Sequence, residues 1–352
     1  MCKKSVLIVG GYGEVGKLIA AELVRSEEYR IILAGRDRQK AEQMASQLGD
    51  KVKGVGFDVS QIGKNEKEIV KNADMVMMCT DQTNTEFVQY YLAQSKLYFD
   101  ISANTQFLGQ LRQLNGFARH HKSMAVINLG LCPGLSNLFA LELMTRHRDA
   151  DEILTGILLG LGENHGKASI EWTLENYIRN FEYNRNQIWP FVSGRNFYFP
   201  AKLGKRKAYR FNFSDQHALK NSYPGYNFST YLCFDLSFVT WFLHCLRKSG
   251  FYRILQLNPL KQLMVGLFSK FSAGKTVYAL STVAIKNKKI IDTLSVSGNQ
   301  EALLAAKVAA TVLRKILTSE IKGGVFDIHS VLSLNDIRQD IQDGLTGISF
   351  SE

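Results

Sequence analysis

The residues with the clearest chemical potential form a short glycine-rich turn near the N-terminus. Gly11, Gly13 and Gly16 have the G-x-G-x-x-G spacing. In this pattern one glycine allows a tight turn, one lets the backbone approach a pyrophosphate, and one lets a helix pack closely on a strand. The first N–H groups and the dipole of that helix favour a bound diphosphate. We therefore predict a dinucleotide-binding turn made of Gly11, Tyr12, Gly13, Glu14, Val15 and Gly16.

The residues after the second apolar run, 30–34, bear on the choice of dinucleotide. Folds that bind NAD place an acidic residue there, where it holds the ribose 2′-hydroxyl. This chain has Gly35, Arg36 and Asp37 instead, and an arginine suits a 2′-phosphate. NADP is therefore favoured over NAD. Asp37 belongs to this predicted site, although its position favours capping of the following helix, residues 39–48, over binding of ribose.

Two further pairs of residues follow apolar runs in the same way. Asp58 and Val59 come after residues 52–57, and Cys79 and Thr80 close the next run. Ligands of open parallel sheets lie at the carboxyl ends of the strands. We therefore expect the first pair near adenine and the second near the ribose or nicotinamide. An ordinary turn carboxylate is an equally good interpretation of Asp58.

Two histidines are candidates for proton transfer. His165 follows a predicted strand, and Asp215 is placed to hold His217. Imidazole titrates near neutral pH, so either side chain is suited to act as a general acid. The structural alternatives are a surface turn and a local hydrogen-bonded loop. The sequence contains no zinc-ligand spacing, nucleophile elbow or P-loop.

The elements that must position these residues alternate between apolar runs and helical stretches. Six short runs occur within the first 128 residues, which predicts a doubly wound parallel sheet, an α/β dinucleotide-binding domain at 1–133. Mixed strands and a helix predict an α+β substrate or lid domain at 134–299. An apolar-periodic helix at 301–317 predicts that residues 300–352 return to the first domain.

Composition describes a soluble globular protein, with 45% hydrophobic and 21% charged residues in 352. The N-terminal apolar run is too short for a signal peptide, so we expect a cytoplasmic enzyme. A homodimer is the oligomeric state that we consider. Five cysteines without a C-x-x-C pair argue against a disulfide framework and a zinc site.

The chain has a net charge of +11, and part of the excess positive charge comes from a basic stretch at 202–210. That stretch is interpreted as a solvated loop, or as a surface that steers an acidic substrate, an anionic lipid surface or nucleic acid. Residues 231–246 are too short to span a bilayer and predict a buried or interfacial helix. We expect a small-molecule substrate, no nucleic acid, no transmembrane segment and at most weak contact with a membrane surface.

The sequence resembles saccharopine dehydrogenases and their relatives over residues 5–145. The resemblance rests on the glycine turn, on residues 34–36 and 57–59, and on the segments 98–102 and 132–137. It implies an NAD(P)-binding domain with a substrate domain inserted before a C-terminal return. It also implies chemistry at a C–N bond through an imine, or, in some branches, reduction of lipid enoyl groups. Ala103-Asn104 stands where the family pattern has Gly-Glu.

We therefore predict an NADP(H)-dependent oxidoreductase that transfers hydride to or from a C=N or C–N bond of an amino-acid-derived substrate. An enoyl reductase acting on a lipid-like C=C bond is one alternative. A non-catalytic NADP-binding sensor is the other.

Overall fold

The computed structural model describes residues 3–162, 166–200, 202–256, 258–270, 274–318, 323–343 and 349–351. The chain folds into two compact units. The first consists of Met1–Leu135 and Ala302–Gly344, and the second of Ser136–Glu301 and Leu345–Glu352. His165 lies outside the described residues.

The first unit contains a parallel sheet with the strand order β15-β6-β5-β4-β1-β2-β3. The strands are β1 (Lys4–Val9), β2 (Tyr29–Gly35), β3 (Val52–Gly56), β4 (Met75–Met78), β5 (Leu97–Asp100), β6 (Met124–Ile127) and β15 (Gly324–Asp327). The chain runs outward from β1 in one direction through β2 and β3, and in the other through β4 to β6. The predicted doubly wound sheet is therefore confirmed, and its switch point lies between β1 and β4.

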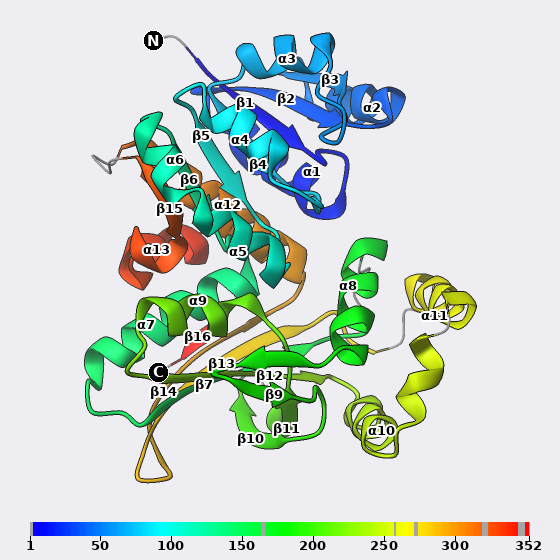
Figure 1. Ribbon diagram of the computed structural model, residues 1–352, viewed down its shortest axis with the longest axis vertical. Coiled ribbons are helices and arrows are strands. Elements are labelled where there is room, and N and C mark those ends of the chain that lie inside the picture. The colour runs from blue at the N-terminus through cyan, green and yellow to red at the C-terminus, as the bar shows by residue number, and fades with distance from the viewer. Residues whose placement is uncertain are drawn as a thin grey trace. The chain divides into compact units, whose positions relative to one another are not determined.

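Helices pack on both faces of this sheet (Figure 1). The helices of this unit are α1 (Glu14–Val24), α2 (Arg38–Leu48), α3 (Lys64–Lys71), α4 (Glu86–Leu92), α5 (Thr105–Gln113), α6 (Asn115–His120), α12 (Glu301–Leu317) and α13 (Leu334–Asp343), with short turns η1 (Leu131–Leu135) and η3 (Ile328–Ser330). Because both faces are covered, the central strands are almost wholly apolar, and all four residues of β4 are fully buried.

One buried and one partly buried ion pair attach the C-terminal elements to the rest of the first unit. Lys307 of α12 lies 3.2 Å from Glu22 of α1, and both side chains are less than a tenth exposed. Arg112 of α5 donates two hydrogen bonds to Asp327 of β15, at 2.7 and 3.0 Å. This fork geometry suits a planar guanidinium. The sequence analysis did not anticipate β15.

The second unit contains a mixed sheet with the order β10-β11-β12-β7-β13-β14-β16. Its strands are β7 (Glu152–Leu159), β10 (Gly194–Phe199), β11 (Gly204–Arg210), β12 (Asn227–Phe234), β13 (Tyr278–Lys286), β14 (Lys289–Gly298) and β16 (Ser349–Ser351), with a separate pair β8 (Phe181–Tyr183) and β9 (Asn186–Ile188). The helical elements are α7 (Ser136–Arg146), α8 (Lys167–Ile178), α9 (Ser214–Ser222), α10 (Ser237–Lys248), η2 (Phe251–Gln256) and α11 (Asn258–Lys270).

Residues 231–246 do not form the single helix that we predicted. Their first four residues complete β12, which pairs in parallel with β7, and α10 begins only at Ser237. The carboxylate of Asp235 ends the strand by accepting hydrogen bonds from the backbone N–H groups of Leu161 and Lys275, at 3.0 and 2.7 Å. An uninterrupted apolar run does not distinguish a buried strand from a helix, which explains the error. Among the helices that the structure describes, none is long and apolar enough to span a bilayer.

The end of the chain also differs from the predicted return to the first domain. β16 pairs with β14 in the second unit, with Phe350 opposite Val296. The ring of Phe350 lies 6.1 Å from that of Phe139 on α7. A three-residue strand of this kind has too little pattern to be detected in a sequence.

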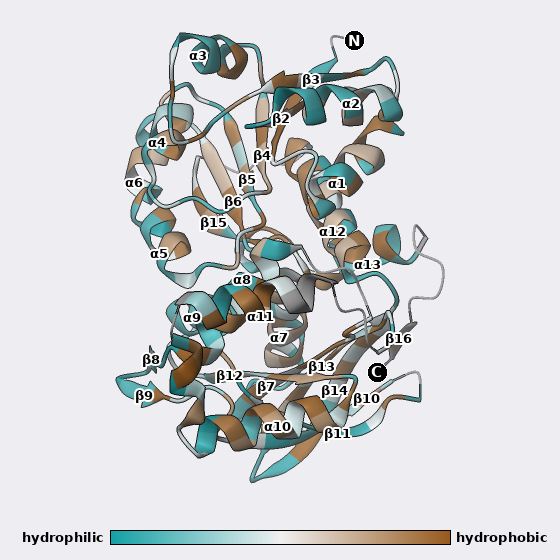
Figure 2. Cartoon of the chain, turned by 90° about the vertical axis from the view of Figure 1, so that its right-hand side faces the viewer, coloured by the Kyte–Doolittle hydropathy of each residue, from teal (hydrophilic) through white to brown (hydrophobic). Residues whose placement is uncertain are grey.

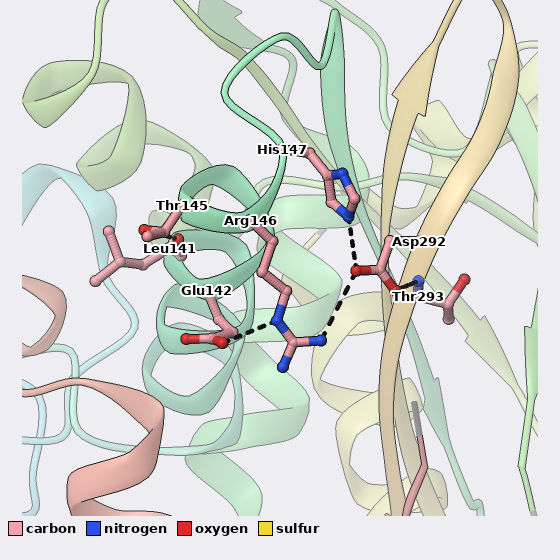
Figure 3. Close-up of polar contacts among 7 residues, drawn as sticks. All are labelled: Leu141, Glu142, Thr145, Arg146, His147, Asp292 and Thr293. Carbon is pink, nitrogen blue, oxygen red and sulfur yellow. Dashed lines mark hydrogen bonds and ion pairs between the residues drawn. The ribbon is translucent and has the colours of Figure 1, made fainter.

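A polar cluster fastens the end of α7 to β14 (Figure 3). Asp292 lies 2.8 Å from Nε2 of His147 and 3.8 Å from the guanidinium of Arg146, which also binds Glu142 at 2.9 Å. These side chains are about a fifth to a third exposed. Because each pairs within the unit's own scaffold, we interpret the cluster as structural.

Candidate cofactor site

The glycine turn joins β1 to α1 at the switch point of the first sheet. A Cβ atom on Gly16 would lie 2.4 Å from the carbonyl oxygen of Gly10, so only glycine allows α1 to approach the turn this closely. Gly13 is the N-cap of α1, and no side chain in the described part of the chain caps the helix. Glu14 in its first turn is paired with Lys17 at 2.8 Å. The first N–H groups of α1 therefore remain suitable for a phosphate ligand.

Tyr12 closes the gap between this turn and the end of β2. Its ring lies over Gly35, where a Cβ atom would be only 2.2 Å from the ring carbon Cε1. The backbone N–H of Asp37 donates to the Tyr12 hydroxyl at 3.3 Å. The turn and the carboxyl end of β2, which the sequence predicted to share one site, are thus in direct contact.

Arg36 follows β2 and is exposed. No described residue holds its guanidinium by a hydrogen bond or an ion pair. Its neighbour Asp37 caps α2, because its carboxylate accepts from the backbone N–H of Lys40 at 3.1 Å. Asp37 also pairs with the ammonium of Lys40 at 3.4 Å. The capping role predicted for Asp37 is therefore observed, and Arg36 is left as the cation at the tip of β2.

Asp58 lies close enough to Arg36 for an electrostatic interaction between the two side chains. Hydrogen bonds from Ser60, with a smaller contribution from Arg36, hold the pKa of the Asp58 carboxyl below its usual range. Asp58 is therefore ionised at neutral pH. Val59 packs against the core of the first unit instead.

The ends of β4 and β5 add a buried polar chain that the sequence analysis did not identify as a site. Gln82 donates to the hydroxyl of Tyr98 at 2.7 Å, and Tyr98 donates to Asp100 at 2.5 Å. The other carboxylate oxygen of Asp100 accepts from the backbone N–H of Ser102 at 2.6 Å. The available signal was a tyrosine and an aspartate at alternate positions of an otherwise apolar strand, which places both on one face.

Burial has two chemical consequences for the hydrogen-bonded residues Gln82, Tyr98 and Asp100. It raises the pKa of Asp100 to about 7, against the lowering effect of the bonds from Tyr98 and Ser102. It also leaves the Gln82 oxygen Oε1 buried, with no hydrogen-bond partner among the described residues. A buried unpaired acceptor costs free energy unless a ligand supplies a donor.

Cys79 and Thr80 follow β4 beside this chain. Burial, and after it the nearby Asp100, raises the pKa of the Cys79 thiol well above its usual range. Cys79 is therefore a neutral thiol at pH 7, unsuited to act as a nucleophile. Thr80 is exposed at the same edge of the sheet.

His217 lies in the second unit, in the first turn of α9, and not in a surface turn or loop. Its Nε2 atom is 2.8 Å from the side-chain oxygen of Asn212. Its ring packs edge-on against Phe181 and Tyr183. Asp215 accepts from Thr230 at 2.9 Å. In the described part of the chain, no group of three or more His, Cys, Asp and Glu side chains is arranged to hold a metal ion.

Residues 6–126 match the family model of the saccharopine dehydrogenase NADP binding domain. The first unit carries this domain. The match confirms the resemblance that the sequence predicted, and it identifies this part of the chain as an NADP-binding domain of the saccharopine dehydrogenase type. No curated protein sequence matches the chain.

Solved structures extend the likeness in fold to the whole chain. The apo structure of saccharopine dehydrogenase (L-Glu forming) from Saccharomyces cerevisiae aligns over 99% of this chain and 100% of its own, with a TM-score of 0.67 and 14% identity. GenD2 from gentamicin A biosynthesis, solved with NAD, aligns over 100% and 97% at 12% identity, with a TM-score of only 0.45. The first of these shows that the fold is shared.

Proposed function

We propose that this saccharopine dehydrogenase-like chain is an NADP(H)-dependent oxidoreductase that acts on a C=N or C–N bond of an amino-acid-derived substrate. The observation that carries the cofactor choice is Arg36, an exposed cation at the end of β2, where doubly wound sheets receive the adenine ribose. The first N–H groups of α1 would hold the diphosphate.

We further propose that Gln82 contacts the nicotinamide half of the cofactor. Gln82 is 7% exposed, its oxygen Oε1 is buried without a partner among the described residues, and it follows β4 beside the switch point. A ribose hydroxyl or the carboxamide N–H₂ group would supply the missing donor. Asp100 then acts through Tyr98 as a positioning residue for Gln82.

The cofactor, when bound, supplies the hydride, because that chemistry belongs to the nicotinamide. An imine nitrogen that is reduced also takes up a proton. We propose His165 or His217 as the source of this proton.

Reduction of a lipid-like C=C bond is the second candidate function. It is favoured by α10, on which Phe238 and Trp241 are 69% and 55% exposed, as expected for a protein that meets lipid.

Consumption of NADPH distinguishes these functions. We expect nicotinamide absorbance to fall when the protein is mixed with NADPH, a 2-oxo acid and an amino acid, which form an imine in solution. A fall only with an enone or enoyl thioester would support the second candidate. Bound NADPH that neither mixture oxidises would contradict both and favour a non-catalytic sensor.

Arg36→Ala is expected to weaken NADPH binding by about tenfold or more, because a charge-assisted hydrogen bond is worth ~1.5–3 kcal/mol. NADH binding should not change. Arg38→Ala is the matched control, since Arg38 is paired with Glu42 at 2.7 Å on α2. Equal weakening of NADPH and NADH by Arg36→Ala would show that Arg36 does not recognise the 2′-phosphate.

A further inference from the structure

Helix α10 presents its largest apolar side chains to solvent. Phe238, Trp241 and Phe242 are 69%, 55% and 49% exposed. Their spacing places them on one face of the helix. The ring of Phe238 lies 5.8 Å from that of Trp241 and 6.3 Å from that of Phe242. The three rings therefore form one exposed cluster, the aromatic surface.

Three polar residues of α10, Thr240, His244 and Arg247, face the interior. Thr240 and Arg247 are each 3% exposed. The Thr240 hydroxyl accepts a backbone N–H at 2.9 Å, and His244 bonds a backbone carbonyl at 2.7 Å. The guanidinium of Arg247 donates to the carbonyl of Ile178 at 2.8 Å and lies 3.6 Å over the ring of Tyr252. A helix of a soluble domain normally has the opposite arrangement. The exposed aromatic residues are thus not needed to hold α10 on the unit.

The next segment extends the exposed apolar character. Phe251 and Ile254 of η2 are 65% and 49% exposed, and Leu263 of α11 is 64% exposed. η2 packs against both α10 and α11. Hydrophobic residues colour much of α10 and α11 in Figure 2. Together, the exposed apolar side chains of α10, η2 and α11 form a larger group than the scattered single ones that are ordinary on the surface of a soluble protein.

Basic residues outnumber acidic ones in the segments that carry the aromatic surface. Residues 236–270 contain no Asp or Glu and five basic residues, which are Arg247, Lys248, Arg253, Lys261 and Lys270. Of these, Lys261 is neutralised by Glu175 at 2.6 Å. The hairpin of β10 and β11 adds Lys205, Arg206 and Lys207, and Arg206 donates to the Ser237 hydroxyl at 2.6 Å, at the start of α10. The basic stretch at 202–210, which we interpreted as a solvated loop or as a surface that steers an anionic partner, forms mostly β11 and lies beside the start of α10.

We propose that α10 docks the protein peripherally on an anionic lipid surface. Aromatic side chains on one helical face enter the boundary between headgroups and acyl chains, while neighbouring Lys and Arg bind lipid phosphates. A second copy of the chain fits the same surface less well, since it would bring two basic regions together. The inference does not depend on the proposed C=N or C–N chemistry, although it uses the aromatic residues that favour the second candidate function.

Co-sedimentation with lipid vesicles tests this proposal. The full chain is expected to sediment with vesicles of phosphatidylcholine mixed with phosphatidylserine, less with phosphatidylcholine alone, and less at high salt. Replacement of all three aromatic residues, Phe238→Ser, Trp241→Ser and Phe242→Ser, should lower the bound fraction about tenfold. Ile290→Ser is the matched control, because Ile290 is 52% exposed on β14 and should bind like the wild type.

A second variant, Lys205→Glu with Lys207→Glu, tests the contribution of the basic residues. It should bind less to the anionic vesicles, although it keeps all three aromatic residues. Unchanged circular dichroism establishes that each variant is folded. The proposal is overturned if the wild type does not sediment with anionic vesicles, or if the aromatic variant sediments as well as the wild type. Conversion of a wild-type oligomer into a monomer by the aromatic variant, without vesicle binding by the wild type, would identify the surface as an interface between copies.

Discussion

His217→Asn or His165→Asn is expected to lower turnover by roughly 10²–10⁴-fold, the usual contribution of a general acid. Asparagine keeps some hydrogen bonding but has no proton that titrates near neutral pH. A proton donor must be protonated to act, so the wild-type rate should fall as pH rises through its pKa, and the pH profile of the inactive variant should flatten. NADPH affinity should stay constant, because the predicted cofactor-binding residues include neither histidine.

His120→Asn is the control for a histidine change that serves no site, since His120 is exposed at the end of α6. Steady-state rates of the three variants between pH 5 and 9 give the comparison. Wild-type turnover in both candidate variants would exclude the two histidines as the acid. A substrate group, a lysine or bound water would then take that role.

Asp100→Asn is expected to remove a pH dependence of stability. The carboxyl has a pKa of about 7 in the folded protein, raised from 3.8. Its proton therefore stabilises the folded protein fully at low pH, and this stabilisation is lost as pH rises from about 4 through 7. A shift of this size corresponds to about 4 kcal/mol. Asparagine resembles the neutral carboxyl at every pH.

Urea unfolding at pH 5, 6, 7 and 8 measures this effect. The free energy of unfolding of Asp100→Asn should rise relative to that of the wild type as pH increases. Asp149→Asn is the control, because Asp149 is 64% exposed, pairs with Lys286 and has a pKa held below its usual range by that lysine. A wild-type minus Asp100→Asn difference that stays constant over this range would show that Asp100 does not titrate there.

The first six strands were predictable because each is a short apolar run between helical stretches. β15 was not, since its four residues join the sheet beside β6 only through pairing with residues 200 positions away in sequence. The boundary between β12 and α10 was not predicted, for a related reason. Pairing with β7 makes residues 231–234 a strand, and nothing local in the sequence records that pairing.

The residues of the candidate site also fall into those that the sequence predicts and those that only the structure reveals. The glycine turn and Arg36 follow from local spacing, so sequence alone placed them. The chain from Gln82 through Tyr98 to Asp100 depends on the alignment of β4 with β5, and the raised pKa of Asp100 depends on burial. The exposure of the aromatic face of α10 was also not predictable from the sequence, because an amphipathic pattern does not show which face of a helix packs against the protein.

Titration of the wild-type protein with NADPH and with NADH, followed by nicotinamide fluorescence, tests the central claim most directly. If Arg36 binds a 2′-phosphate beside the glycine turn, NADPH should bind more tightly than NADH by about tenfold or more. Equal affinity for both cofactors, tighter binding of NADH, or binding of neither would contradict the account.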